Sequence, residues 1–239
     1  MVISTHAIVL SKIRYRDNDL IVKCYTQQYG VLSFLLRGVL KSKKGLTKTA
    51  HFQLLSQLQL VIVYNPNRSL HTIKEAKINH LYSSIHTNIL KGSIVMFLSE
   101  VLSNILKEEE QNETLFSFIE TTLLWLDTHS EYSNFHLLFL LKLSKYLGFY
   151  PEKINLEYDY FNLEDGKFEV KQLGIYTVSG ENIMLLKQLL GTKFEALSNV
   201  KIGTKQRQSF LNMLLLYYEL QLGEFKKPKS LQVLNQVFS

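Results

Sequence analysis

Residues 20–48 decide the fold; they read L-I-V-K-C-Y-T-Q-Q-Y-G-V-L-S-F-L-L-R-G-V-L-K-S-K-K-G-L-T-K. Side chains suited to opposite faces of a sheet alternate over Leu20–Thr26, and a second apolar run covers Gly30–Arg37. This pattern predicts two β-strands joined by a short turn. The stretch ends in Arg37–Lys48, which carries five basic residues, no acidic residue and two glycines, and is therefore expected to form a basic loop after the second strand.

Three further segments of the first eighty residues have strand character. They are Ile3–Leu10, Phe52–Tyr64 and Ser69–Ala76, and a polar turn is expected over Arg14–Asp19. Five short strands with turn signals between them are typical of a small closed barrel, and the five-stranded barrel that binds oligonucleotides is the OB-fold. The fold class predicted for the chain is therefore α+β, with an N-terminal OB-fold barrel.

The hydrophobic period changes to that of a helix after residue 80. Helices are expected over residues 81–105, 113–127, 134–147, 181–190 and 205–222, with a further short one near 193–197 and a basic tail after Gly223. An extended insert over residues 152–179 is expected to form a hairpin that turns at Glu164-Asp165-Gly166. The sequence thus predicts a barrel domain at 1–80 and a helical domain at 81–239.

Charge is divided unevenly between these two parts. The chain has 239 residues and a net charge of +6, but residues 1–80 hold 12 basic and 3 acidic residues, for +9. Residues 81–239 hold 15 basic and 18 acidic residues, for −3. A positive field of this kind attracts a polyanion, either a nucleic acid or an anionic membrane surface. We therefore expect the first third of the chain to be the binding part.

The candidate nucleic-acid contacts are basic residues of the loop, together with more distant basic residues and one aromatic ring. Lysine and arginine neutralise phosphates, and an aromatic ring can stack on an unpaired base. The simpler interpretation is that the loop is an ordinary solvated surface segment and that the aromatic residues of the strands belong to the core. The candidates are Arg37, Lys41, Lys43, Lys44, Lys48, Arg14, Arg16, Tyr15 and Arg68.

The sequence offers no pattern for catalysis, a metal or a cofactor. The single cysteine, Cys24, rules out an internal disulfide or a zinc site built from several cysteines, and its place on an alternating strand indicates core packing. The seven histidines form no metal-binding motif, the Asp17–Asp19 turn lacks the rest of a calcium loop, and the common nucleotide-binding and hydrolase motifs are missing. We expect a protein that is not an enzyme and needs no cofactor.

Two further expectations concern surroundings and partners. No apolar run reaches the roughly 18 residues of a membrane span and the N-terminus lacks the features of a signal peptide, so a soluble protein of a reducing cytoplasm is expected. Phe210, Leu214, Tyr217 and Tyr218 recur at helical spacing, which is typical of a core face. The alternative is that the two tyrosines and the basic tail line a groove for an acidic, partly apolar peptide.

Several motifs together resemble one known family. The opening A-I-V-L-S-K-I-R-Y-R-D-N-D-L-I-V-K-C-Y-T-Q-Q-Y-G-V-L-S-F-L-L-R-G spans Ala7–Gly38, and K-S-K-K-G follows it. The likeness continues through Phe52–Tyr64, His71–Ala76 and the segment L-G-F-Y-P at Leu147–Pro151. In these features the chain is similar to the bacterial recombination mediator family RecO, most specifically in the first eighty residues.

The resemblance implies a noncatalytic protein of DNA repair and recombination, associated with the bacterial nucleoid. It implies binding to single- and double-stranded DNA, annealing of complementary strands coated with single-strand-binding protein (SSB), and action with RecR to help load RecA. At matching positions it implies DNA contacts from Arg37, Lys41, Lys43 and Lys44. Some members carry a four-cysteine zinc module, but Glu152–Ser179 contains no cysteine, so zinc dependence is not implied here.

Two other functions are compatible with the composition. The first is an OB-fold protein that binds RNA in translation or RNA handling, which competition between matched DNA and RNA strands would distinguish. The second is an enzyme with a carboxylate–metal site, which a metal-dependent nuclease assay would reveal.

Overall fold

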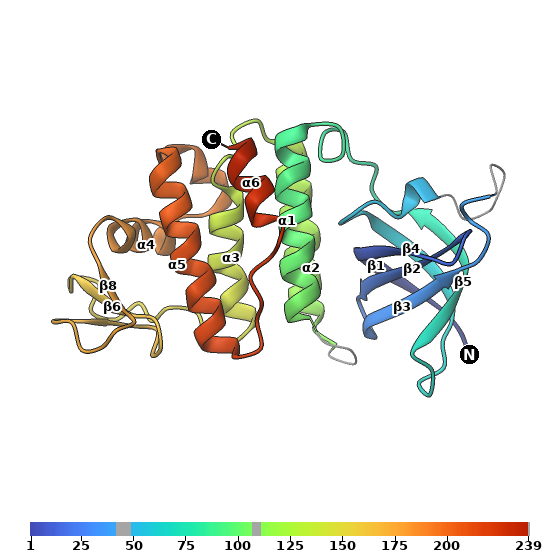
Figure 1. Cartoon of the computed structure of the whole chain (residues 1–239), viewed down its shortest axis with the longest axis horizontal. Helices are drawn as coiled ribbons and strands as arrows, with labels where there is room; N and C mark the ends of the chain where they lie inside the picture. The colour runs from blue at the N-terminus through green and yellow to red at the C-terminus, as the bar shows by residue number, and fades with distance from the viewer. Residues whose placement is uncertain (42–48, 107–110, 239) are drawn as a thin grey trace. The chain divides into compact units, whose positions relative to one another are not determined.

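The computed structural model describes residues 1–41, 49–106 and 111–238, and its chain divides into two compact units (Figure 1). The first unit contains Met1–Thr128 and Pro228–Ser230, and the second contains His129–Lys227 and Leu231–Ser239. The first two long helices group with the barrel in this division. The predicted boundary between domains at residue 80 stays a prediction.

The first unit is built on a closed five-stranded barrel, as the sequence predicted. Its strands follow the spatial order β1-β2-β3-β5-β4, in which all neighbours are antiparallel except β3 and β5. The barrel closes because β1 is long enough to pair with β4 along its first half and with β2 along its second half. The strands are β1 Val2–Tyr15, β2 Asp19–Thr26, β3 Gly30–Leu36, β4 Gln57–Val63 and β5 Leu70–Ile78.

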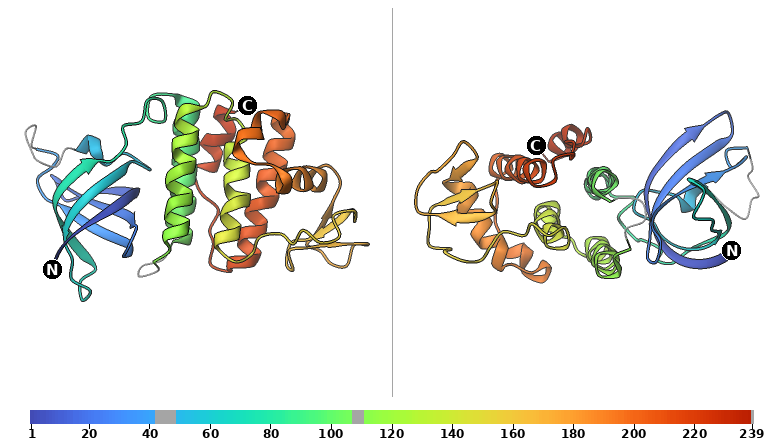
Figure 2. Two further views of the ribbon diagram at one scale, coloured as in Figure 1. Left: turned by 180° about the vertical axis from the view of Figure 1, so that it is seen from behind. Right: turned by 90° about the horizontal axis from the view of Figure 1, so that it is seen from below.

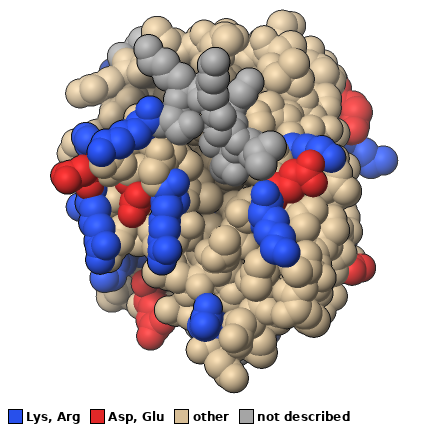
Figure 3. Space-filling model, turned by 90° about the vertical axis from the view of Figure 1, so that its right-hand side faces the viewer, with Lys and Arg blue, Asp and Glu red and all other residues tan. Residues whose placement is uncertain are grey.

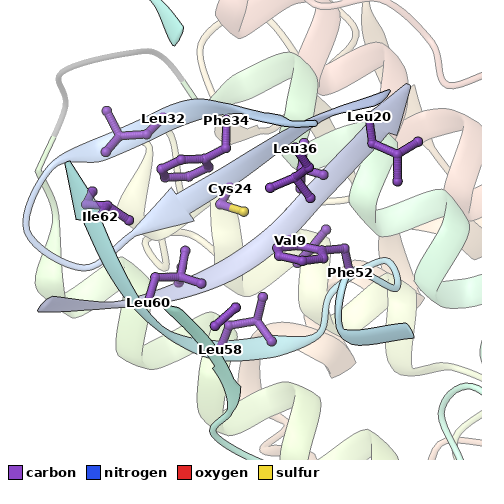
Figure 4. Close-up of a cluster of buried hydrophobic side chains, with 13 residues drawn as sticks. Val9, Leu20, Cys24, Leu32, Phe34, Leu36, Phe52, Leu58, Leu60 and Ile62 are labelled. Carbon is purple, nitrogen blue, oxygen red and sulfur yellow. The ribbon is translucent and has the colours of Figure 1, made fainter. Parts of the chain in front are cut away.

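Alternating side chains of these strands fill the barrel. Val9, Cys24, Phe34 and Leu60 are all fully buried and point into one apolar cluster, as Figure 4 shows. Cys24 is therefore a core residue, as expected from its place in the alternation. Burial raises the pKa of its thiol far above the ordinary value, because a thiolate has no water to solvate it there.

Two strand predictions need correction. Strand β1 runs on to Tyr15, so the predicted polar turn contains only Arg16–Asn18. Strand β4 begins at Gln57 rather than at Phe52, because residues 49–51 form a short 3₁₀ helix and Leu55 takes a left-handed conformation with φ of 58°. The apolar character of Phe52 instead reflects burial in the barrel core.

Two helices complete the first unit, α1 (Ile89–Ile105) and α2 (Glu113–Thr128). The prediction that the first helix extends from residue 81 is wrong, because Leu81 is exposed and Asn88 caps the helix by accepting a hydrogen bond from the backbone N–H of Lys91 (3.1 Å). Residues 83–85 are held instead by the Asp127 carboxylate near the end of α2.

The second unit packs helices α3, α4 and α5 together, with a small sheet beside α4 (Figures 1 and 2). The predicted hairpin is present and gains a third strand, giving the order β7-β6-β8. A last helix, α6, replaces much of the expected basic tail. The elements are α3 Phe135–Tyr146, β6 Tyr160–Asn162, β7 Lys167–Glu169, β8 Thr177–Ser179, α4 Glu181–Gly191, a 3₁₀ helix Phe194–Asn199, α5 Thr204–Leu222 and α6 Leu231–Val237.

Aromatic packing holds the small sheet in place. The Phe161 and Phe168 rings lie 4.9 Å apart, and Phe161 also meets the ring of Tyr217 from α5 at 5.8 Å. Gly166, at the hairpin turn, has φ of 68°, and a Cβ there would lie 2.6 Å from the Tyr217 hydroxyl. Only glycine fits this turn without a shift of the tyrosine.

Among the residues that the structure describes, no helix is both long enough and apolar enough to cross a bilayer.

Candidate nucleic-acid interface

The β1–β2 turn presents two arginines and a tyrosine at one end of the barrel. Arg14 donates a hydrogen bond from Nη2 to the carbonyl oxygen of Asp17 (3.1 Å), which tethers its side chain to the turn. The guanidinium carbon of Arg16 lies 5.2 Å from the centre of the Tyr15 ring, a cation–π contact. All three side chains are exposed, so their charges and the ring edge face solvent.

The start of the basic loop is fastened to this same turn. The backbone N–H of Gly38 donates to Oδ1 of Asp19 (2.8 Å), and that of Leu40 donates to the carbonyl oxygen of Asn18 (3.1 Å). These bonds hold the exposed residues Arg37 and Lys41 beside the turn. The Asp19 carboxylate thus ties the turn to the start of the basic loop, whereas Asp17 accepts through its backbone carbonyl oxygen.

The loop itself continues beyond the part of the chain that the structure describes. Of its predicted phosphate contacts, Lys43, Lys44 and Lys48 lie outside the described residues. The described site therefore consists of the turn and the anchored base of the loop.

The strand register extends this site down the outer face of the barrel. Leu20, Val22 and Cys24 point inward, so their neighbours on β2 point outward. Tyr15 and Asp19 form the first outward-facing row, next to the turn. The second row, two residues further from the turn, is apolar: Ile13 pairs with Ile21, and Ile21 pairs with Leu35. A polar row follows, made of Ser11, Lys23 and Ser33.

Sequence reasoning did not include these outer rows among the candidate contacts. Ile13 is 63% exposed, and Lys23 is half-buried within the sheet. The alternation that places Ile21 and Lys23 on one side of β2 was visible in the sequence, but which side faces solvent depends on barrel closure. In OB-folds the faces of strands 2 and 3, with the loops 1–2 and 4–5, bind oligonucleotides.

Helix α2 limits this face on its other side. The Tyr25 ring is buried, lies 5.7 Å from that of Phe116, and its hydroxyl donates to the carbonyl oxygen of Asn112 (3.0 Å). Tyr25 is therefore a packing residue. The accessible face runs from the Lys23 row to the Arg16 turn. Figure 3 shows a surface on which Lys and Arg side chains, with some Asp and Glu among them, surround uncharged residues.

Arg68 lies apart from the other candidates. It belongs to the β4–β5 turn, and the parallel pairing of Ser33 with Leu70 places it at the level of Val31 on β3. Arg37 is six residues further along β3, a separation of roughly 20 Å at 3.3 Å per residue. The structure thus brings Arg14, Tyr15 and Arg16 together with Arg37 and Lys41, but not with Arg68.

The helical tyrosines do not form a groove. Tyr217 and Tyr218 are 2% and 0% exposed, and their hydroxyls donate to the backbone carbonyls of Phe149 (2.5 Å) and Leu140 (2.7 Å). The groove interpretation is therefore wrong, because both rings are part of the core of the second unit.

The second unit instead offers a polar cavity of about 490 Å³. Its lining includes Lys201 and Arg207 as well as Glu131, which lies 3.9 Å from Lys201. Arg207 donates from Nε to Oδ1 of Asn134 (3.0 Å) and from Nη2 to the carbonyl oxygen of Ile202 (3.1 Å). These bonds keep the half-buried guanidinium at the wall of the cavity, although burial lowers its pKa.

The buried histidine near this cavity is not suited to carry charge. Burial, together with the positive charge of Arg207, lowers the pKa of His136 to about 3. Within residues 1–41, 49–106 and 111–238, no three His, Cys, Asp or Glu side chains cluster as metal ligands would.

The fold and the site define a class of protein: a closed OB-like barrel with a cationic, partly aromatic end, followed by a helical part. Two family models cover nearly the whole chain, "Recombination protein O N terminal" over residues 1–82 and "Recombination protein O C terminal" over residues 86–232. The chain belongs to the RecO family of DNA repair proteins.

Full-length relatives agree with this assignment. The chain is 47% identical over 238 residues to DNA repair protein RecO of Christiangramia forsetii, and 42% identical over 239 residues to that of Flavobacterium psychrophilum. It is 36% identical over 242 residues to that of Bacteroides fragilis strain ATCC 25285. In each case the match covers 100% of both chains.

Proposed function

We propose that this chain is a noncatalytic recombination mediator that binds single- and double-stranded DNA through the barrel. The observation that carries the proposal is the fastening of Arg37 and Lys41 beside the Arg14–Arg16 turn by the Gly38–Asp19 and Leu40–Asn18 hydrogen bonds. Positive charges fixed on one surface neutralise successive phosphates, and Tyr15 lies among them. Lys43, Lys44 and Lys48 continue the same charge run in the sequence.

The salt dependence of binding tests this proposal. Each phosphate contact contributes about 0.7 to the slope of log affinity against log salt concentration for single strands, and about 0.9 for duplex DNA. The double variant Arg37→Ala/Lys41→Ala should therefore lower the single-strand slope by about 1.4. A triple variant at Lys41, Lys43 and Lys44 should lower it by about 2.1.

The matched control is Lys153→Ala/Lys171→Ala, which removes two exposed charges from the second unit. Fluorescence anisotropy with a labelled oligonucleotide, measured from 50 to 300 mM salt, gives the slopes. If the barrel variants keep the slope of the unmodified protein, the assignment of this surface fails.

We further propose that the bound strands are complementary strands coated with SSB, which the protein anneals, and that it acts with RecR to promote RecA loading. Support comes from family membership. The acidic SSB tail would suit the cavity that Lys201 and Arg207 line, because these two basic residues outnumber Glu131 in its lining. An SSB tail peptide should capture less of the Lys201→Glu variant than of the unmodified protein, and as much of the Lys171→Glu variant. Equal capture of the two variants would refute this docking site.

An RNA-binding function is the second candidate, since a cationic barrel face also suits RNA. Competition between DNA and RNA strands of the same sequence distinguishes the two. Preference for the RNA strand would favour this alternative.

A further inference from the structure

Three aromatic rings form a stack at the opposite end of β3 from Arg37. The ring centroids of Tyr29 and Tyr64 are 4.7 Å apart, with an angle of 40° between the ring planes. Tyr64 stacks on His71 at 5.3 Å, with an angle of 18° between the planes. His71 in turn meets the fully buried ring of Phe34 at 6.2 Å. The stack therefore begins in the barrel core and ends at the half-buried Tyr29.

A hollow lies beside this stack, between the β2–β3 turn and the β4–β5 turn. Its lining includes the three rings, the hydroxyl-bearing residues Ser33 and Ser69, and the exposed residue Arg68. Among the described residues that line it, none is acidic. The hollow is shallow, with a volume of only about 40 Å³, so a ligand larger than a few water molecules can lie only across its mouth. There it would meet aromatic rings, small polar groups and one positive charge.

Both turns that bound the hollow are held by their own hydrogen bonds. The Thr26 hydroxyl accepts from the backbone N–H of Tyr29 (3.1 Å) and donates to the carbonyl oxygen of Gly30 (2.7 Å). Asn65 accepts twice, at its side-chain oxygen from the N–H of Asn67 (3.0 Å) and at its carbonyl oxygen from the N–H of Arg68 (3.1 Å). The backbones that carry the ring and the guanidinium are therefore preorganised.

We propose that one unpaired nucleotide lies across the mouth of this shallow hollow, where its base packs against the half-buried Tyr29 ring and its phosphate pairs with the exposed Arg68. The inference rests on the proposed DNA-binding function and adds a second contact point to it. Stacking needs an exposed base face, which a paired and stacked duplex does not present. The hollow therefore selects single strands, whereas the Arg37 surface contacts phosphates of either form.

The separation of the two contact points sets the length of the strand. Arg68 and Arg37 lie roughly 20 Å apart along β3, and a single OB-fold covers about 4–16 nucleotides. One strand that follows β3 can thus reach both points. A gain in affinity with oligonucleotide length is expected once the strand spans that distance.

Substitutions at Tyr29 and Arg68 test the inference in the full-length protein. Tyr29→Ala should weaken binding of a single-stranded oligonucleotide by about tenfold, the order of loss for one base stacked on an aromatic side chain. Tyr29→Phe keeps the ring and should bind as the unmodified protein does. Arg68→Ala should lower the single-strand salt slope by about 0.7, and both alanine variants should leave duplex affinity unchanged.

The matched control for Tyr29→Ala is Tyr158→Ala, a half-buried tyrosine of the second unit. Circular dichroism and the thermal midpoint establish that each variant is folded. Because Tyr29 packs against the barrel core, Arg68→Ala serves as the second, exposed probe if Tyr29→Ala is unfolded. A set of oligonucleotides, each with 2-aminopurine at a different position, should contain one whose fluorescence changes on binding. This change should disappear with Tyr29→Ala, or with Arg68→Ala if Tyr29→Ala does not fold.

Three outcomes separate this inference from the proposed function. If the Arg37 and Lys41 substitutions reduce DNA binding but folded Arg68→Ala and Tyr29→Ala bind single strands normally, the nucleotide site is refuted and the DNA-binding surface stands. Equal losses for single strands and duplex in the Arg68 and Tyr29 variants would also refute it. Absence of DNA binding by the unmodified protein would refute the proposed function itself.

Discussion

The carboxylate of Asp127 joins the end of helix α2 to residues 83–85, and we predict that its replacement by asparagine destabilises the first unit. Its Oδ2 accepts from the backbone N–H (2.8 Å) and the hydroxyl (2.9 Å) of Ser83. Its Oδ1 accepts from the backbone N–H groups of Ser84 (2.8 Å) and Ile85 (2.9 Å). The Asp127 side chain is buried, so water cannot replace these bonds.

The size of the effect follows from the two bonds that asparagine cannot make. Its amide nitrogen would stand where Oδ2 stands and would face the donors of Ser83. Loss of two hydrogen bonds to a charged group, each worth about 1.5–3 kcal/mol, predicts a loss of at least roughly 3 kcal/mol in the free energy of unfolding. For a chain of this length that corresponds to a fall of about 6–12 °C in the thermal midpoint.

Acid should reduce the same stabilisation in the unmodified protein. The backbone and hydroxyl donors lower the pKa of Asp127 below its ordinary value, although burial opposes this shift. A carboxyl group whose pKa is lower in the folded state stabilises the fold above its unfolded pKa of about 3.9 and loses that contribution as the pH falls below it. The difference in stability between the unmodified protein and Asp127→Asn should therefore shrink below about pH 4.

Urea unfolding followed by circular dichroism, at pH 7 and at pH 3.5, measures both effects. Asp159→Asn, at an exposed site, is the matched control and should change stability little. A loss of less than 1 kcal/mol at pH 7, or a difference that grows in acid, would refute the reasoning.

Three further predictions concern packing and capping. Gly166→Ala should cost at least about 2 kcal/mol of stability in urea unfolding, because an L-residue is strained at φ of 68° and its Cβ would meet Tyr217. Gly174→Ala is the control and should be nearly neutral, because there is open space around that position. Cys24 should react with a thiol reagent only after unfolding, since its thiol is buried; rapid reaction of the native protein would contradict this. Glu100→Gln should cost about 1–2 kcal/mol of stability, measured by a thermal melt. The Glu100 carboxylate accepts from the backbone N–H groups of Lys229 (2.8 Å) and Ser230 (2.9 Å) and from the Ser230 hydroxyl (2.6 Å). An unchanged melting temperature would show that these three hydrogen bonds contribute little.

Local patterns were sufficient where neighbours in the chain set the structure. The alternation of Leu20–Thr26 predicted a strand with Cys24 in the core, and the strand, turn and burial are confirmed. The hairpin at Gly166 and the end of α5 at Gly223 are confirmed for the same reason, since a positive φ at glycine is a local property. The misplaced start of β4 at Phe52 shows the limit, because an apolar side chain is buried equally well by a strand or by an irregular segment.

The sequence predicted most of the residues that form the candidate site, but not how they are placed relative to one another. Charge along the chain identified Arg37 and Lys41 and the Arg14–Arg16 turn, and the hydrogen bonds to Asp19 and Asn18 bring them together. The same charge count included Arg68, which the parallel β3–β5 pairing places roughly 20 Å away. Helical spacing alone could not tell that Tyr217 and Tyr218 are buried, because a helix face can contact a core or a partner.

By itself the sequence determined most of the elements, the barrel class, the unequal division of charge and the family, since all of these depend on residue order and local periodicity. Only the tertiary structure decided which strand faces are accessible, how the β1–β2 turn holds the base of the basic loop, and how residues 29, 64 and 71 meet in one stack. The physical reason is that barrel closure brings distant strands into register, and a register is a relation between segments that neither segment encodes alone.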